Sequence, residues 1–330
     1  MNLKEEILKL KKELDVTVVA HFYQRDEVFE LADITGDSLE LAKKVMDTKT
    51  KYVVFCGVGF MGESVKIMSP EKIVLMPRVA CCAMARMIDE GYFEENLKLI
   101  NEAGIPNENI LPITYINSSA RVKARVGMMG GMVCTSSNAY KIIEKGLESG
   151  KKIFFVPDRC LGQNFAKSLN LKSAVVGDGT NLKDADIICY NGFCSVHQQF
   201  NVDDIDFYRA KYPGILVAVH PECDPKVCEK ADFIGSTSQL ITYIKNLPIE
   251  QKVVVGTEFN MVNRLREKNT YILSSTKPEC PTMNETTLEH LYATLKSIKD
   301  NKISPLTEIT VDEDTIKWAK IALQRMFEIW

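Results

Sequence analysis

The chain has 330 residues, of which 45% are apolar and 26% are charged, a composition typical of a globular protein with a sizeable core. Its formal charge of −3 argues against nonspecific electrostatic binding to nucleic acid or to an anionic membrane. No apolar run reaches the roughly 18 residues of a membrane span, and the charged start MNLKEEILKLKKEL is unlike a signal peptide, so we expect a cytoplasmic protein.

Strand and helix patterns alternate along the chain. Apolar side chains recur at spacings of three and four over residues 3–14, which predicts an amphipathic helix. Short β-rich runs follow, separated by helical patterns: VTVVAHF, KYVVFCG, EKIVLM, ILPITYI, KKIFFV, ADIICY, ILVAVH and KVVVG. Such continuous apolar runs are typical of parallel strands buried on both faces, so we predict an α/β fold. A last helix, over about 311–330, should pack back on one of the domains.

The same order of parts occurs three times. A strand ends in polar groups, a second strand ends in a small hydroxyl turn, a third ends in another loop, and a cysteine closes the unit. The polar strand ends lie at 20–23, 115–117 and 219–222, the hydroxyl turns at 36–38, 135–137 and 235–238, and the closing cysteines are Cys82, Cys194 and Cys280. Ligands bind at the carboxyl ends of parallel strands, so three such edges predict one shared cavity. We expect three domains, over residues 1–105, 106–205 and 206–330.

One cysteine per unit would bring three thiols to that cavity. The chain has ten cysteines but no CxxC pair, so zinc-ribbon and thioredoxin spacings are absent. Three thiolates without a fourth partner favour an iron–sulfur cluster with one open iron, which could act as a Lewis acid, over a four-ligand zinc site. Alternatively, the three are ordinary buried thiols. Two local contexts favour ligation, because Cys280 precedes Pro281 at a helix start and His197 follows Cys194 by three residues.

The hydroxyl turns indicate anion binding. A helix N-terminus with free backbone N–H groups and a Ser or Thr cap can hold a carboxylate or a phosphate, although each turn alone could be a simple cap. The three candidate turns centre on Ser38, Ser136 and Ser236-Thr237. Together they predict a small substrate with several negative charges. Side chains that could orient it and transfer protons are Tyr23, Tyr115, Asn117, His197, His220 and Glu222.

Ten motifs in order, between about residues 17 and 300, resemble the quinolinate synthase family, iron–sulfur enzymes of bacterial and archaeal NAD biosynthesis. They are AHFYQ (20–24), GDSLELA (36–42), MGESVKIMSPEKIVLMP (61–77), YINSSARVKA (115–124), TSSNA (135–139), GFCSVH (192–197), VHPEC (219–223), GSTSQL (235–240), GTEFNMVNRL (256–265) and CPTMNETTLEHLY (280–292). One such motif alone would be weak, but ten in order make chance similarity implausible.

The resemblance implies a fold, a cofactor and a reaction. The fold is three pseudo-symmetric αβα domains with parallel sheets around a central active site. The cofactor is a [4Fe–4S] cluster held by Cys82, Cys194 and Cys280, with one open iron. The reaction condenses iminoaspartate with dihydroxyacetone phosphate to give quinolinate, phosphate and water. An L-aspartate oxidase or dehydrogenase would then be the upstream source of iminoaspartate.

The resemblance also implies residue roles. The catalytic residues it implies are His21, Tyr23, His197, His220 and Glu222, with Glu222 as the general base. The substrate-binding residues it implies are His21, Ser38, Tyr115, Asn117, Ser136, His220, Glu222, Ser236 and Thr237.

This chain departs from the family pattern at cysteine positions. The CxxC that precedes the third ligand in some members is absent, and Cys160 replaces an expected asparagine in the loop 157–162. Cys81 fills the small-residue place before the first ligand, and the roles of Cys81 and Cys160 stay open. Two other functions stay open on the residues alone. One is a non-catalytic iron–sulfur or zinc-binding sensor with the same three thiols, and the other is a cluster-free α/β enzyme acting on sugar phosphates.

Overall fold

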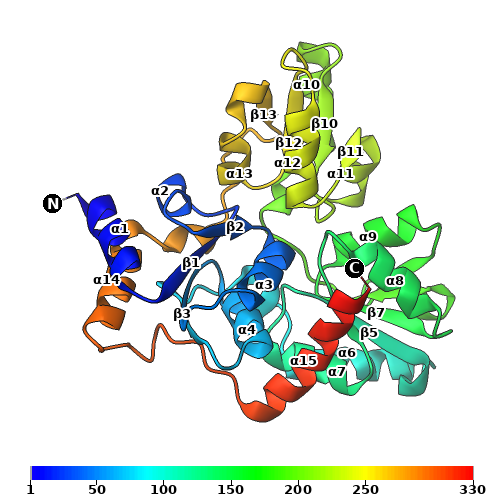
Figure 1. The fold of residues 1–330 in the computed structure, drawn as a ribbon. Coiled ribbons are helices and arrows are strands. Elements are labelled where there is room, and N and C mark those ends of the chain that lie inside the picture. The colour runs from blue at the N-terminus through cyan, green and yellow to red at the C-terminus, as the bar shows by residue number, and fades with distance from the viewer. Residues whose placement is uncertain (1, 330) are drawn as a thin grey trace.

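The computed structural model describes residues 2–329 and contains three parallel sheets covered by helices (Figure 1). The first sheet has the spatial order β2-β1-β3-β4 and consists of β1 (Val16–His21), β2 (Ile34–Gly36), β3 (Tyr52–Cys56) and β4 (Ile73–Leu75). The second has the order β6-β5-β7-β9-β8 and consists of β5 (Ile110–Tyr115), β6 (Met132–Cys134), β7 (Lys152–Val156), β8 (Ser173–Val175) and β9 (Ile187–Cys189). The third has the order β11-β10-β12-β13 and consists of β10 (Leu216–Val219), β11 (Phe233–Ile234), β12 (Val253–Gly256) and β13 (Thr270–Ile272).

The three sheets repeat one strand order, which confirms the predicted α/β architecture. We call each sheet with its covering helices the first, second and third lobe. In every lobe the first strand lies between the second and the third. The pairing also ends at matching levels, because His21 pairs with Gly36 and Tyr115 pairs with Cys134. The additional strand β8 at the edge of the second sheet accounts for the longer middle unit.

Helices connect the strands and cover the sheets. They are α1 (Leu3–Glu13), α2 (Asp26–Phe29), α3 (Ser38–Met46), α4 (Gly59–Met68), α5 (Ala83–Arg86), α6 (Glu90–Glu102), α7 (Ala120–Met128), α8 (Ala139–Leu147), α9 (Arg159–Ser168), α10 (Val202–Lys211), α11 (Pro225–Lys230), α12 (Thr237–Asn246), α13 (Phe259–Asn263), α14 (Leu288–Lys299) and α15 (Glu313–Glu328). Short 3₁₀ helices lie at Asn107–Asn109, Leu182–Asp184, His197–Gln199, Arg266–Lys268 and Met283–Glu285. Among the helices described between residues 2 and 329, none is long and apolar enough to cross a membrane.

The last two helices return to the first and second lobes. Helix α14 packs against α1 and β3, whereas α15 packs against α7, β6 and α4. Figure 1 shows α15, in red, lying against the first two lobes, while the third lobe projects at the top of the view. The predicted domain ranges of 1–105, 106–205 and 206–330 stay predictions.

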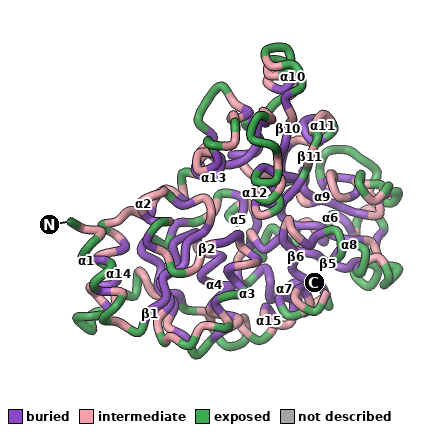
Figure 2. Tube along the Cα trace, turned by 45° about the horizontal axis from the view of Figure 1, so that its top comes forward, coloured by how far each residue is buried: buried purple, intermediate pink, exposed green. Residues whose placement is uncertain are grey.

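The strands form the buried centre of each lobe, as their apolar runs predict. Every residue of β1 and β5 is buried, and the tube in Figure 2 is purple along these strands and mostly green at the outer loops. One continuous apolar core joins the first and second sheets, while the third lobe has apolar clusters of its own. The third lobe therefore has apolar clusters distinct from the shared core, and Phe22 and Tyr23 of the first lobe pack against one of them.

Candidate functional site

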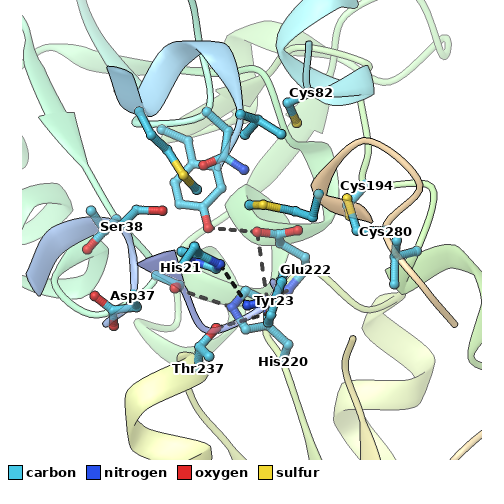
Figure 3. Close-up of a pocket in the computed structure, with 18 of the residues that line it drawn as sticks. His21, Tyr23, Asp37, Ser38, Cys82, Cys194, His220, Glu222, Thr237 and Cys280 are labelled. Atoms are coloured by element: carbon cyan, nitrogen blue, oxygen red, sulfur yellow. Dashed lines mark hydrogen bonds and ion pairs between the residues drawn. The ribbon is translucent and has the colours of Figure 1, made fainter. Parts of the chain in front are cut away.

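A cavity lies where the three lobes meet, at the carboxyl ends of the strands (Figure 3). A concave site between domains, with a few polar groups converging on it, is typical of small-molecule binding. All but one of the residues predicted from the sequence line it: His21, Tyr23, Ser38, Cys82, Tyr115, Asn117, Ser136, Cys194, His197, His220, Glu222, Thr237 and Cys280. The site is thus assembled from segments far apart in sequence.

The exception is Ser236, whose side chain caps the N-terminus of helix α12. Ser236 is the N-cap of α12: its hydroxyl accepts a hydrogen bond from the Gln239 backbone N–H, and its own N–H donates to Gln239 Oε1. This reciprocal pair is a capping box. Ser236 is completely buried and does not line the cavity, whereas the adjacent Thr237 does.

The cap of α3 is Asp37, not the predicted Ser38. The Asp37 carboxylate accepts hydrogen bonds from the backbone N–H groups of Leu39 and Glu40, and Ser38 is the first helical residue. Sequence reasoning missed Asp37 as a cavity residue, although an Asp followed three positions later by Glu40 is the spacing of a capping box.

Hydroxyl turns from all three lobes meet at Asp37. Asp37 Oδ2 accepts hydrogen bonds from Ser137 Oγ at 3.1 Å and from Ser238 Oγ at 2.8 Å. Ser137 precedes α8 and Ser238 lies in the first turn of α12, so one carboxylate joins the three helix starts. The turns therefore form one connected wall of the cavity.

His21 and His220 occupy matching turns and have the same tautomer. The backbone N–H two residues later donates to Nδ1 of each ring, from Tyr23 at 3.1 Å and from Glu222 at 3.3 Å. A neutral ring whose Nδ1 accepts carries its proton on Nε2. His220 Nε2 can thus donate to Ser136 Oγ, 3.3 Å away. Burial lowers the pKa of His21 to about 4 and that of His220 to about 3, so both are neutral N–H donors near pH 7.

Glu222 is an ionised carboxylate at the centre of the site. Tyr115 donates a hydrogen bond of 2.6 Å to Oε1, and His197 Nδ1 lies 3.0 Å from Oε2. Burial opposes ionisation, but His220, His197 and the Tyr115 hydrogen bond outweigh it and lower the pKa of Glu222. A buried, ionised carboxylate can accept a proton from a bound ligand.

Two tyrosines cross from one lobe to another. The Tyr23 hydroxyl, from the first lobe, lies 3.0 Å from Thr237 Oγ1 and 2.9 Å from Thr257 Oγ1 in the third. The Tyr115 hydroxyl, from the second lobe, binds Glu222 in the third. Burial, together with the Glu222 charge, raises the pKa of both phenols well above the usual value. Both are therefore neutral hydroxyls at physiological pH.

Asn117 offers the cavity a free acceptor. Its Oδ1 atom is buried and has no hydrogen-bond partner. The backbone on both sides of Asn117 is held by Lys123, a fully buried residue whose Nζ donates to the carbonyls of Ile116, at 2.8 Å, and Ser118. Because buried acceptors are rarely left unpaired, Asn117 Oδ1 is ready to accept a hydrogen bond from a ligand.

The described wall of the cavity contains no lysine or arginine side chain. Positive potential for an anion therefore comes from the N-terminal ends of α3, α8 and α12 and from the Nε2–H groups of the two histidines. Asp37 and Glu222 add negative charge, so an anionic ligand must be seated by directed N–H and O–H donors.

Cys82, Cys194 and Cys280 contribute one thiol each to the same cavity. Cys82 precedes α5, Cys194 follows β9, and Cys280 follows β13. Figure 3 shows them on the side of the site opposite Asp37 and Ser38. Burial is the main cause that raises the pKa of Cys82 to about 12, and the nearby Cys280 adds to it. Binding to a metal group would offset that cost, because a bound cation favours thiolates.

The three sulfurs do not have the spacing that a single bound ion requires. They do not all lie within 4.8 Å of one another. Two sulfurs on one zinc lie at most about 4.6 Å apart, since each Zn–S bond is about 2.3 Å. A polynuclear iron–sulfur cluster spreads its thiolate ligands over several metal atoms. The donor set thus suits an iron–sulfur cluster.

The other cysteines lie away from the cavity wall. Cys81 is exposed, and the rest are buried thiols in the lobes: Cys56, Cys134, Cys160, Cys189, Cys223 and Cys228. Cys160 accepts a hydrogen bond from Gln198 Nε2 at 3.4 Å. At the position where the family pattern has asparagine, this chain therefore has a buried thiol.

Comparisons with known proteins agree on one family. A family profile described as "Quinolinate synthetase A protein" matches residues 5–328. A quinolinate synthase of Helicobacter pylori (strain HPAG1) is 53% identical over 334 residues, covering 99% of this chain and 98% of the relative. Quinolinate synthases of Acidobacterium capsulatum and Streptomyces coelicolor are each 39% identical, covering 99% and 95% of this chain and 93% and 84% of the relatives.

Proposed function

Because this chain belongs to the quinolinate synthase family, we propose that its central cavity condenses iminoaspartate with dihydroxyacetone phosphate to quinolinate, phosphate and water. Members of this family are iron–sulfur enzymes of NAD biosynthesis that act on small molecules. The observation that carries the proposal is the meeting of one cysteine from each lobe with the buried Glu222 carboxyl group in one cavity.

The proposed cofactor is a [4Fe–4S] cluster held by Cys82, Cys194 and Cys280, with one iron free of protein ligands. When bound, it would supply Lewis-acid chemistry that assists the loss of water from a substrate hydroxyl. The non-catalytic sensor is not favoured, since the relatives that match nearly the whole chain are synthases. The cavity also holds proton-transfer groups that a sensor would not need.

The helix starts and hydroxyls would seat the anionic groups. The substrate-binding residues that we propose are His21, Ser38, Tyr115, Asn117, Ser136, His220, Glu222, Ser236 and Thr237. For Ser236 we propose only an indirect part, in which its cap holds Thr237 at the cavity wall. Hydrogen-bond donors around the cavity would replace the water that hydrates the carboxylates and the phosphate in solution. Because these donors are fixed in place, they would also hold the reacting carbon atoms close enough for a bond to form.

Proton transfer would be shared by Glu222, Tyr23 and the histidines. Glu222 is the proposed general base, held by Tyr115 and by His197, whose Nε2 lies 3.1 Å from Thr257 Oγ1. The Tyr23 hydroxyl, placed between two threonine hydroxyls, would donate to an oxygen of the three-carbon substrate. His21 and His220 would act as Nε2–H donors to bound oxygens.

The first test is anaerobic purification with iron and sulfide quantitation, followed by an assay for quinolinate from the two substrates. We expect a coloured protein that forms quinolinate, and loss of both iron and activity in Cys82→Ser, Cys194→Ser and Cys280→Ser. Retention of full iron and sulfide in the triple variant would overturn the cofactor proposal. Activity that persists without the cluster would point to a cluster-free enzyme.

Two further proposals concern supply and compartment. Iminoaspartate would come from an upstream L-aspartate oxidase or dehydrogenase, and the enzyme would act in the cytoplasm. Both can be checked by co-purification and by fractionation of the source cells.

A further inference from the structure

We propose that Cys194, His197 and Glu222 bind a single divalent transition-metal ion, best matched by Zn²⁺, whenever the chain lacks its cluster. One ligand atom from each of the three lies within 4.8 Å of the other two. Across residues 2–329, this is the only set of three or more His, Cys, Asp or Glu side chains that meets this spacing. The inference rests on the proposed function, because the ion and the cluster would compete for Cys194.

The donor atoms are those that zinc prefers. Thiolate sulfur, imidazole nitrogen and carboxylate oxygen bind Zn²⁺ at about 2.0–2.3 Å, so atoms on one ion lie within about 4.6 Å of each other. The three side chains need little movement to reach such an arrangement. The three cluster thiols are more widely spaced, so they would have to move closer together to share one ion.

His197 is already oriented as a metal ligand. Its Nε2 atom pairs with Thr257 Oγ1 at 3.1 Å, which leaves Nδ1 facing Glu222. Nδ1 is buried and lies 3.0 Å from Glu222 Oε2, so the two atoms are close enough to share one ion. A buried imidazole nitrogen that faces a carboxylate oxygen at this distance is an arrangement that a cation could bridge.

Glu222 is oriented by a second partner in the same way. The Tyr115 hydroxyl donates to Oε1 at 2.6 Å, which leaves Oε2 for an ion. Such outer hydrogen bonds fix ligands in protein metal sites. His197 and Glu222 are both nearly completely buried, at 1% and 4% exposed, so the ion would be shielded from solvent.

Zinc binding would replace the S–H bond of Cys194 with an S–Zn bond and would involve no redox step. The Cys194 S–H bond breaks, its proton passes to the buffer, and an S–Zn bond forms. Three protein ligands leave a fourth position for water, the pattern of an open zinc site. Since Cys194 cannot serve both groups as a terminal ligand, a zinc-loaded chain would be unable to take up the cluster until the ion is removed.

The test uses the full chain, freed of its cluster anaerobically with a chelator and titrated with ZnSO₄ by calorimetry. We expect one Zn²⁺ per chain, with affinity weakened about tenfold or more in Cys194→Ser, His197→Gln and Glu222→Gln. Cys82→Ser and Cys280→Ser are matched controls that should bind zinc as the unsubstituted chain does. Co²⁺ in place of Zn²⁺ should show the absorption of one thiolate ligand, lost only in Cys194→Ser.

Two results would overturn the inference. One is the absence of stoichiometric zinc binding to the unsubstituted, cluster-free chain. The other is an equal loss of zinc in the Cys82 or Cys280 variants, which would mean that the three thiols share the ion. Circular dichroism of each variant separates misfolding from ligand loss. Cluster assembly on the unsubstituted chain is measured in parallel, so a failure of zinc binding alone leaves the proposed function intact.

Discussion

Tyr23 is held more closely than an ordinary surface tyrosine. Its hydroxyl lies between Thr237 and Thr257, and its ring meets the edge of the His21 ring at a centroid distance of 4.7 Å. Tyr23 lies just after the end of β1 in the first lobe, and its hydroxyl contacts two threonine hydroxyls of the third lobe. A single oxygen atom is thus both a contact between lobes and a candidate proton donor.

Tyr23→Phe should keep the cluster and slow turnover. Loss of a positioned proton donor typically costs about a hundredfold or more in rate, whereas no cluster ligand is touched. Iron and sulfide content should match the unsubstituted chain while kcat falls. Tyr243→Phe, at a tyrosine that stacks on Phe233 away from the cavity, is the matched control. An unchanged kcat in Tyr23→Phe would remove this hydroxyl from the mechanism.

His21 should make the fold sensitive to acid. Burial is the main cause that lowers the pKa of His21 from 6.5 to about 4, against the opposing charge of Asp37. The unfolded chain therefore takes up a proton in this window that the folded chain does not. Stability due to neutral His21 is complete above pH 6.5 and is lost as the pH falls towards 4, by up to about 1.4 kcal/mol per pH unit.

The variant His21→Asn keeps an acceptor for the Tyr23 backbone N–H but has no group that titrates in this range. Urea unfolding at pH 7 and pH 5 should show a smaller loss of unfolding free energy in the variant. If the two chains lose the same amount, His21 is not the group responsible.

The turn after β5 depends on one buried ammonium group. Lys123, on α7, donates to the carbonyls on both sides of Asn117, and its Nζ lies 5.4 Å from the centre of the Phe60 ring. Burial lowers the pKa of Lys123 to about 7, while Glu63 opposes the shift. A buried cation is costly unless such partners satisfy it, so this residue has a specific structural task.

Lys123→Met should loosen this turn. The methionine fills similar space but leaves the Ser118 carbonyl without this donor, at a cost of about 2 kcal/mol in unfolding free energy. Urea unfolding measures that loss, and kcat/KM for quinolinate formation should fall as Asn117 loses its position. Lys141→Met, at an exposed site on α8, is the control. Equal stability and equal kcat/KM in both variants would contradict this role.

Much of the element structure could be predicted from the sequence, and the failures have physical causes. Each apolar run became a strand, because continuous burial on both faces leaves few other options. The hydroxyl turns were located correctly, but two expected caps were wrong. Asp37 caps α3 in place of Ser38, and the residue at the cap of α8 is Asn138 in place of Ser136. Helices α14 and α15 could not be assigned to a lobe from the sequence. An apolar face shows that a helix is packed, but it does not identify the element that it packs against.

At the scale of the molecule, polar contacts join the third lobe to the others. Asn164 Nδ2 of the second lobe donates to the carbonyls of Pro221 and Cys223 at 2.8 and 2.9 Å. Arg264 of the third lobe donates to the carbonyls of Phe22 and Gln24 and pairs with Asp26 at 2.6 Å. These bonds fix the loop that carries Tyr23, so the position of the third lobe controls the site.

Arg264→Ala should release that loop. Loss of its charge-assisted hydrogen bonds is expected to cost about 2 kcal/mol, and amide hydrogen exchange over residues 22–26 should speed up. Quinolinate formation should slow while the cluster remains. Arg266→Ala, two positions away at an exposed residue, should change neither quantity. Unchanged exchange in Arg264→Ala would mean that other contacts hold the loop.

The repeated strand order has a consequence for how a ligand can be oriented. The frame repeats three times, yet the side chains at corresponding strand ends differ: His21, Tyr115 and His220 at one level, and Tyr23, Asn117 and Glu222 two residues on. A molecule rotated by one third of a turn about the centre would therefore exchange a phenol for an amide or a carboxylate. The backbone arrangement repeats, but the side chains that it carries do not. An asymmetric ligand can therefore match these side chains in only one orientation.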